Sequence, residues 1–144
     1  MDSLLRGRWA FYNVWRNVSS APVQRSPLAL CDAASTSVED LVVFEIRYAD
    51  RIGENYFTRA NPKHAWYHFP LLTRDEAVLI KCWDSRGADF AGRMEAARGH
   101  APPPPSEPTV RATFSLHTGV ELAQTPEDAP DRESIEVRTV AFFE

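Results

Sequence analysis

The sequence predicts a mainly β domain, a sandwich or barrel of roughly six or seven short and mostly antiparallel strands. Aromatic and branched residues recur in short segments, and several of these alternate with polar residues at a period of two. Proline, glycine and aspartate separate the segments. No stretch combines the length and the 3.6-residue period that would indicate a helix.

The first half of the chain contains two well-marked strand patterns. Residues 9–18 are rich in aromatic and branched side chains, which favour a pleated and partly buried surface. Pro22 and Pro27 then interrupt the pattern. The next apolar segment, residues 41–48, alternates in its second half and predicts a strand with one wet face.

Three further segments predict strands in the middle of the chain. Residues 54–59 follow a glycine-containing turn, and the aromatic run 65–69 ends at Pro70. Residues 73–76 could cap a short helix, but the segment 77–83 is too short and too branched for one. We therefore expect a turn followed by a buried strand there.

Residues 86–109 differ in character from the rest of the chain. They contain three glycines, several alanines and the four consecutive prolines 102–105. Such a run adopts an extended conformation that forms few hydrogen bonds, which predicts an irregular surface excursion. A ligand for a proline-binding domain is the alternative, and a plain spacer is favoured because nothing else marks a recognition site.

The last two strands are predicted on either side of a proline-containing loop. Residues 110–117 alternate and end at His117, and residues 134–143 form the clearest strand pattern of the chain. Together with the preceding segments, they predict one domain over residues 1–144.

Composition excludes several function classes. The formal charge of −4 and the absence of a Lys/Arg run argue against nucleic acid as a partner. No window approaches the roughly 18 apolar residues of a membrane span, and the N-terminus lacks the apolar core of a signal peptide. The two cysteines lie in unlike sequence settings, which favours two reduced thiols over a disulfide. We therefore expect a cytoplasmic protein. A mitochondrial location is the alternative, because arginines outnumber acids near the N-terminus.

The four histidines are the candidate chemical groups. His64 and His68 would lie on one face of a strand and could hold a metal, although Trp66 would lie between them and packing is the favoured interpretation. His100 falls in the surface excursion and is expected to be solvated. The sequence has no Gly-x-Ser-x-Gly elbow, no phosphate loop and no Cys-x-x-Cys pair.

His117 has a more specific setting. Arg132 follows it after fifteen positions, and Ser134 lies two residues further on. A strand histidine that ligates a metal, with an arginine and a hydroxyl that bind a carboxylate, suits a dicarboxylate co-substrate. On spacing alone, a strand-end histidine and a surface arginine are the favoured interpretation, because one histidine with a downstream Arg-x-Ser occurs by chance in many proteins.

Several short motifs occur together in one order along the chain. They are Tyr12-Asn13-Val14-Trp15-Arg16, Pro22-Val23-Gln24, Pro27-Leu28-Ala29-Leu30-Cys31-Asp32, Gly53-Glu54, Asn61-Pro62-Lys63-His64, Trp66-Tyr67, Asp75-Glu76, Lys81-Cys82-Trp83-Asp84-Ser85, His117-Thr118 and Pro130-Asp131-Arg132-Glu133-Ser134-Ile135-Glu136-Val137-Arg138. In this order the chain resembles the AsaB-type hydroxylase/desaturase family, which includes gibberellin desaturases and cephamycin-pathway proteins. The resemblance runs from Trp9 to Phe143 and leaves out the excursion.

The resemblance implies a double-stranded β-helix (jelly-roll) oxygenase that uses Fe(II), 2-oxoglutarate and O₂ on a small metabolite of secondary metabolism. It assigns His117 to the distal iron ligand, and Arg132 and Ser134 to the clamp on the 2-oxoglutarate carboxylate. It assigns no catalytic residue beyond these, and a homo-oligomer is left open.

One departure from the family pattern bears on activity. Members carry a His-x-Asp ligand pair upstream of the Asn-Val-Trp-Arg block, and this chain has no His-x-Asp. We therefore expect a single oxygenase-like domain that is incomplete at its N-terminus and inactive alone. The alternative function is that of a truncated non-catalytic relative that binds a metabolite or a protein partner.

Overall fold

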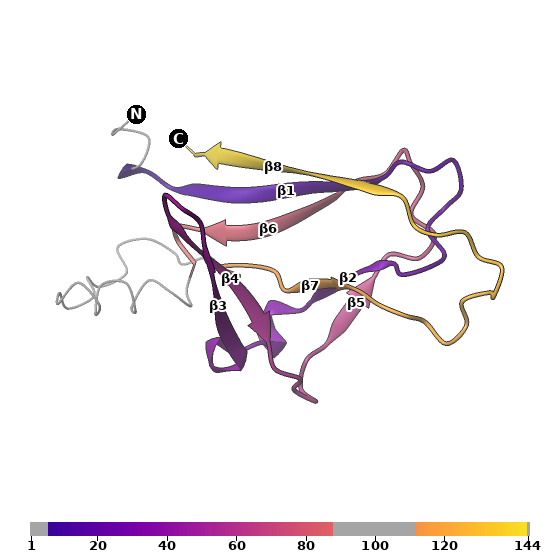
Figure 1. The fold of residues 1–144 in the computed structure, drawn as a ribbon, viewed down its shortest axis with the longest axis horizontal. Helices are drawn as coiled ribbons and strands as arrows, with labels where there is room; N and C mark the ends of the chain where they lie inside the picture. The colour runs from indigo at the N-terminus through magenta and orange to yellow at the C-terminus, as the bar shows by residue number, and fades with distance from the viewer. Residues whose placement is uncertain (1–5, 88–111, 144) are drawn as a thin grey trace.

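A computed structural model describes residues 6–87 and 112–143, which form eight strands and two short 3-10 turns (Figure 1). The strands are β1 (Trp9–Asn17), β2 (Leu28–Cys31), β3 (Leu41–Arg47), β4 (Ile52–Thr58), β5 (Trp66–His68), β6 (Val78–Asp84), β7 (His117–Gly119) and β8 (Ser134–Phe142). The 3-10 turns are η2 (Ala33–Ser35) and η3 (Val38–Asp40). None of the described helical turns is long and apolar enough to cross a membrane.

The strands form two three-stranded antiparallel sheets and one hairpin. The first sheet has the order β6-β1-β8 and the second the order β5-β2-β7, and β3 pairs with β4. From β5 to β8, successive strands pass from one sheet to the other, so the chain crosses repeatedly between two layers (Figure 1). The predicted mainly β architecture is confirmed.

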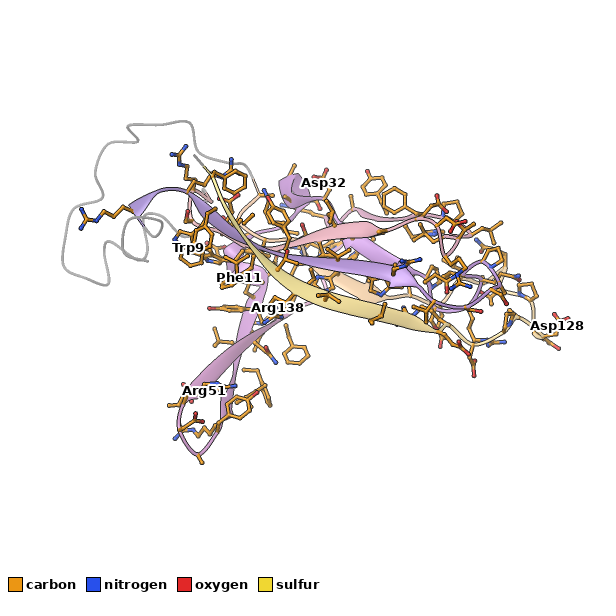
Figure 2. The ribbon with its side chains drawn as sticks, turned by 90° about the horizontal axis from the view of Figure 1, so that it is seen from above. Trp9, Phe11, Asp32, Arg51, Asp128 and Arg138 are labelled. Carbon is orange, nitrogen blue, oxygen red and sulfur yellow. The ribbon has the colours of Figure 1, made fainter. Side chains whose placement is uncertain are left out.

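The core lies between the two sheets. Its buried members are Trp15 from β1, Val78 and Ile80 from β6, Leu28 from β2, and Val23 and Leu72 from the connecting loops. Side chains alternate along a strand, so Asn13, Trp15 and Asn17 of β1 all point into this layer, and all three are buried. The hairpin β3-β4 instead projects away from both sheets (Figures 1 and 2).

Two strand predictions need correction. Residues 28–31 form β2, which was not predicted because a four-residue strand directly after Pro27 shows no alternation. Residues 112–116, the described part of the predicted strand over 110–117, lie outside any strand, and His117 begins β7 rather than ending a strand. The predicted excursion over 86–109 lies almost wholly outside the described residues.

A β-bulge interrupts the ladder between β1 and β6. The register shifts between Phe11 and Tyr12, which pair with Trp83 and Lys81, so Cys82 is the extra residue on β6. A bulge lets consecutive side chains emerge on the same side of a sheet. This irregularity is the reason that Cys82 and Trp83 can both contribute to one surface.

A buried carboxylate fixes the end of the same ladder. Asp84 is 1% exposed, and its Oδ2 accepts a hydrogen bond of 2.8 Å from Nη2 of Arg8. The backbone N–H of Arg86 also donates to Asp84, and Nζ of Lys81 lies 3.5 Å away. Burial raises the pKa of the Asp84 carboxyl, but these hydrogen bonds and positive charges lower it more, so the net pKa lies below its usual value.

We expect Asp84→Asn to lower the free energy of unfolding at pH 7 by roughly 1.5–3 kcal/mol, the usual contribution of hydrogen bonds to a charged group. The depressed pKa stabilises the folded chain above pH about 4, and this stabilisation is lost as the pH falls through the folded-state pKa. Urea unfolding between pH 2.5 and 7 measures both effects. The free energy of unfolding of the variant should change less with pH than that of the parent. An equal change in both proteins would contradict the depressed pKa of Asp84. Asp128→Asn, at an exposed loop position, is the control.

Candidate functional site

The predicted metal ligand lies on a short edge strand. His117 begins β7, pairs with Leu30 of β2, and is exposed. Its Nδ1 lies 2.8 Å from the backbone oxygen of Ser115. A carbonyl oxygen can only accept, so in the neutral imidazole Nδ1 carries the proton and Nε2 carries the lone pair. The imidazole is therefore held in the tautomer that can ligate a metal through Nε2.

The predicted carboxylate-binding arginine lies beside the same strand. Nη1 of Arg132 donates a 2.6 Å hydrogen bond to the backbone oxygen of Ser26, and a Cβ built on Gly119 would lie 3.4 Å from that nitrogen. Gly119 is two residues after His117, and residues two apart share a face of a strand. The guanidinium of Arg132 thus lies on the face of β7 toward which the imidazole of His117 points.

Ser134 is exposed at the start of β8, on the row of that strand whose residues face the same side of the sheet as Asn17. It pairs with Asn17 of β1, and Arg132 lies over Trp15 at 5.7 Å from its ring centre. Because Asn17 and Trp15 both point toward the core, Ser134 and Arg132 lie on the same side of the sheet. The structure therefore brings Arg132 and Ser134 to the inner side of this sheet and sets Arg132 next to β7.

A cavity of about 780 Å³ opens beside His117. It is bordered by residues of β1, β3, β4, β6 and β8 and by the segment that leads into β7: Trp9, Phe11, Asn13, Leu41, Asn55, Tyr56, Cys82, Trp83, Phe114, Ser115, Leu116, His117, Glu136 and Arg138. Arg132 and Ser134 are not among the lining residues. The cavity thus lies on the residue 114–117 side of His117, whereas Arg132 lies on the Gly119 side.

A second arginine, Arg138, lines this cavity through a buried amide network. Asn13 is 4% exposed, and its Oδ1 accepts a 3.2 Å hydrogen bond from Nε of Arg138. The Nδ2 of Asn13 donates to Oε1 of Glu136. The sequence did not mark Arg138 as a site residue, although the polar row at 134, 136 and 138 is visible in it. What it lacked was the register that sets Asn13 opposite Arg138.

The cavity thiol is not activated as a nucleophile. Burial raises the pKa of Cys82, Arg138 lowers it and Glu136 raises it, with a net result above the usual value. Cys82 is therefore a neutral thiol at pH 7.

His64 and His68 do not form the alternative metal pair. His64 precedes β5 and places Nε2 3.0 Å from Oδ2 of Asp40, while Nδ2 of Asn61 donates to the other oxygen. These two hydrogen bonds, from Asn61 and His64, hold the pKa of Asp40 below its usual value. His68 lies within β5, and its buried Nδ1 has no hydrogen-bond partner among the described residues.

The described residues by themselves do not fit an iron site. Within residues 6–87 and 112–143, no three His, Cys, Asp or Glu side chains lie close enough to hold a metal ion. A site for an Fe(II) oxygenase needs two histidines and a carboxylate. Of such a set, His117 is the one residue that the sequence predicted as a ligand, and this role stays a prediction.

Comparison with known proteins identifies a group of oxidoreductases. The profile of a family described as an oxidoreductase/YMDC permease-like domain matches residues 1–102. Aspirochlorine biosynthesis protein N of Aspergillus oryzae is 33% identical over 99% of this chain and 52% of its own length. Hydroxylase/desaturase asaB of Aspergillus flavus is 31% identical over 99% of this chain and 59% of its own length. The chain thus spans about half the length of these relatives.

Solved structures show the same fold. The iron and alpha-ketoglutarate-dependent endoperoxidase NvfI is 26% identical, with a TM-score of 0.74 over 98% of this chain and 44% of the NvfI chain. This likeness and the passage of the strands between two antiparallel sheets confirm the predicted jelly-roll core.

We expect the purified chain, supplied anaerobically with Fe(II) and 2-oxoglutarate, to show no metal-to-ligand charge-transfer band. With O₂ it should form no succinate above a His117→Ala control. The reason is that one imidazole cannot provide the binding free energy of a three-ligand site. A clear band together with His117-dependent succinate would contradict this expectation. Absorption spectra and succinate assays of both variants give the measurement.

Proposed function

Because the chain belongs to the AsaB-type hydroxylase/desaturase family of oxidoreductases, we propose that it provides the co-substrate-binding part of a hydroxylase/desaturase of secondary metabolism. The enzyme would use Fe(II), 2-oxoglutarate and O₂ on a small molecule. In this proposal, Arg132 and Ser134 bind the distal carboxylate of 2-oxoglutarate, and His117 is one ligand to iron. We further propose a cytoplasmic protein that acts without nucleic acid or membrane.

The observation that carries the proposal is the position of Arg132 beside β7. Its Nη1 is next to Gly119, on the face of β7 that also bears His117. A dicarboxylate that reaches a metal at the imidazole can extend along this face toward the guanidinium. A charge-assisted contact to a planar guanidinium fixes both the distance and the orientation of such a ligand.

The guanidinium is held in place before any ligand arrives. The backbone oxygen of Ser26 accepts from Nη1, and the ring of Trp15 lies under the group. Within residues 6–87 and 112–143 only this N–H of Arg132 is hydrogen-bonded, so the other donors of its guanidinium can bind a carboxylate. A pre-oriented arginine loses less side-chain freedom on binding than a free one, which favours affinity.

Ser134 adds a hydroxyl on the same inner side. It is the first residue of β8 and lies opposite Asn17, two residues along the chain from Arg132. A hydroxyl can donate to a carboxylate oxygen that the guanidinium leaves free. Arg132 and Ser134 together therefore offer hydrogen-bond donors to a terminal carboxylate.

Fe(II) with 2-oxoglutarate would supply the oxidising chemistry, but the described residues provide only His117 toward that metal. This incomplete ligand set favours a second candidate function, a non-catalytic relative that binds a metabolite. Both candidates require an intact ligand-binding face, and they differ in whether succinate is formed.

We expect Arg132→Ala to weaken 2-oxoglutarate binding to the metal-free chain by about 10- to 150-fold, which corresponds to roughly 1.5–3 kcal/mol for a charge-assisted contact. Arg138→Ala should change the dissociation constant by less than about threefold, because Arg138 lies in the cavity on the other side of His117. Titration calorimetry, with ligand-observed NMR for weak variants, gives these constants. If 2-oxoglutarate does not bind saturably, or if Arg138→Ala loses more affinity than Arg132→Ala, the proposed role of Arg132 is wrong.

A further inference from the structure

The cavity beside His117 has one aromatic end and one polar end. Trp9, Phe11 and Asn13 line it from β1, because alternation sets every second residue of this strand on one face. Figure 2 shows Trp9, Phe11 and Arg138 near the base of the projecting hairpin, whose tip carries Arg51. The lining therefore changes from aromatic to polar along a single strand.

The aromatic end is a rigid apolar surface. The rings of Trp9 and Trp83 lie 4.5 Å apart at 36°, and the ring of Phe11 packs edge-on against Trp9 at 5.5 Å. Trp83 reaches this surface because the bulge makes both Cys82 and Trp83 line the cavity. Flat faces of this kind bind planar or fused-ring groups through burial and offset stacking.

The polar end is built around one cation. Asn13 holds Nε of Arg138 through its Oδ1, and its Nδ2 is directed to Glu136. The amide of Asn13 thus accepts from Nε, and the described residues show no hydrogen bond from either Nη group of Arg138, so both can donate to a ligand. Among the described residues, no carboxylate lies within ion-pair distance of the Arg138 guanidinium.

Glu136 balances the charge of Arg138 at this end, so it is the hydrogen-bond geometry that favours an anionic acceptor at the guanidinium. The carboxylate of Glu136 accepts from Asn13, and the pKa of Cys82 is raised by burial, so the thiol carries no charge. A cation that lacks an ion-pair partner beside an apolar wall gains most from a ligand that brings a carboxylate. Arg138 is exposed, and a purely apolar ligand would leave its guanidinium to water alone.

We propose that this cavity binds an apolar carboxylic acid that contains a planar or fused ring. Arg138 holds the carboxylate, and Trp9, Phe11 and Trp83 hold the ring system. The identification of this acid as the substrate rests on the proposed function, since His117 borders the same cavity. Arg138 is then the residue that determines specificity, and Arg132 serves the co-substrate.

The probe is 2-naphthoate, and the matched neutral ligand is 2-naphthamide. We expect the chain to bind 2-naphthoate at least about 10-fold more tightly than the amide, by calorimetry, as a charge-assisted contact allows. In NMR spectra of ¹⁵N-labelled chain, the indole signals of Trp9 and Trp83 should shift more than those of Trp15 and Trp66. Trp→Phe variants assign the four signals.

Arg138→Gln should abolish the preference for the carboxylate, and Arg138→Lys should restore part of it. Arg51→Gln, at the exposed tip of the hairpin, is the matched control and should keep the preference. Circular dichroism of each variant confirms that it is folded. Equal affinity for the two probes, an unchanged preference in Arg138→Gln, or shifts confined to Trp15 and Trp66 would overturn the proposal.

A competition arm separates this proposal from the proposed function. Saturating 2-oxoglutarate should leave 2-naphthoate bound, because the two acids occupy opposite sides of His117. Displacement of 2-naphthoate by 2-oxoglutarate in the parent chain would overturn the cavity assignment. A third result is also informative: 2-naphthoate binding depends on Arg138, but Arg132→Ala does not weaken 2-oxoglutarate binding. That result would support the cavity assignment and reject the proposed function.

Discussion

The strand β1 is hydrogen-bonded along its length to β6 on one side and to β8 on the other. A strand paired on both sides has no freedom to slip by one residue without turning its buried face toward water. Its odd-numbered side chains, Trp9 to Asn17, must therefore all face the inner layer. Trp15 fills the core there, whereas Trp9, Phe11 and Asn13 border the cavity. Core and candidate site thus depend on one alternating row.

Two buried amides in that row connect packing to chemistry. Nδ2 of Asn17 donates to the backbone oxygens of Ala21 at 2.8 Å and Leu72 at 3.2 Å, which ties the loops to the sheet. Asn13 bonds instead to Glu136 and Arg138 of β8. A buried amide without partners would cost roughly 1–3 kcal/mol, so each asparagine stabilises only the arrangement that satisfies it. The amide of Asn13 consequently aims the guanidinium of Arg138 as well as stabilising the ladder.

The strands β1, β6 and β8 could be predicted from the sequence, because each has a long run of aromatic or branched residues. The sequence was insufficient near β7, where residues 112–116 alternate like a strand but remain outside one. Their hydrogen bonds are isolated contacts, such as Ser115 N–H to Lys81 O and Cys31 N–H to Leu116 O. Arg132 lies near Gly119 of the His117 strand, and its role as a clamp stays a prediction. The Arg138 cavity could not be foreseen, since it requires both the β1-β8 register and the bulge at Cys82.

In the proposed arrangement, two separate arginines would allow an acid-binding cavity and a carboxylate clamp to coexist around one histidine. Two anionic ligands that shared one arginine would compete for it, and their like charges would repel at close range. Here Arg132 lies beside Gly119, and Arg138 borders the cavity that residues 114–117 help to line. Each acid would then have its own counter-charge, and the imidazole would be within reach of both. Such an arrangement lets an apolar acid and a dicarboxylate bind together, which a reaction between co-substrate and substrate requires.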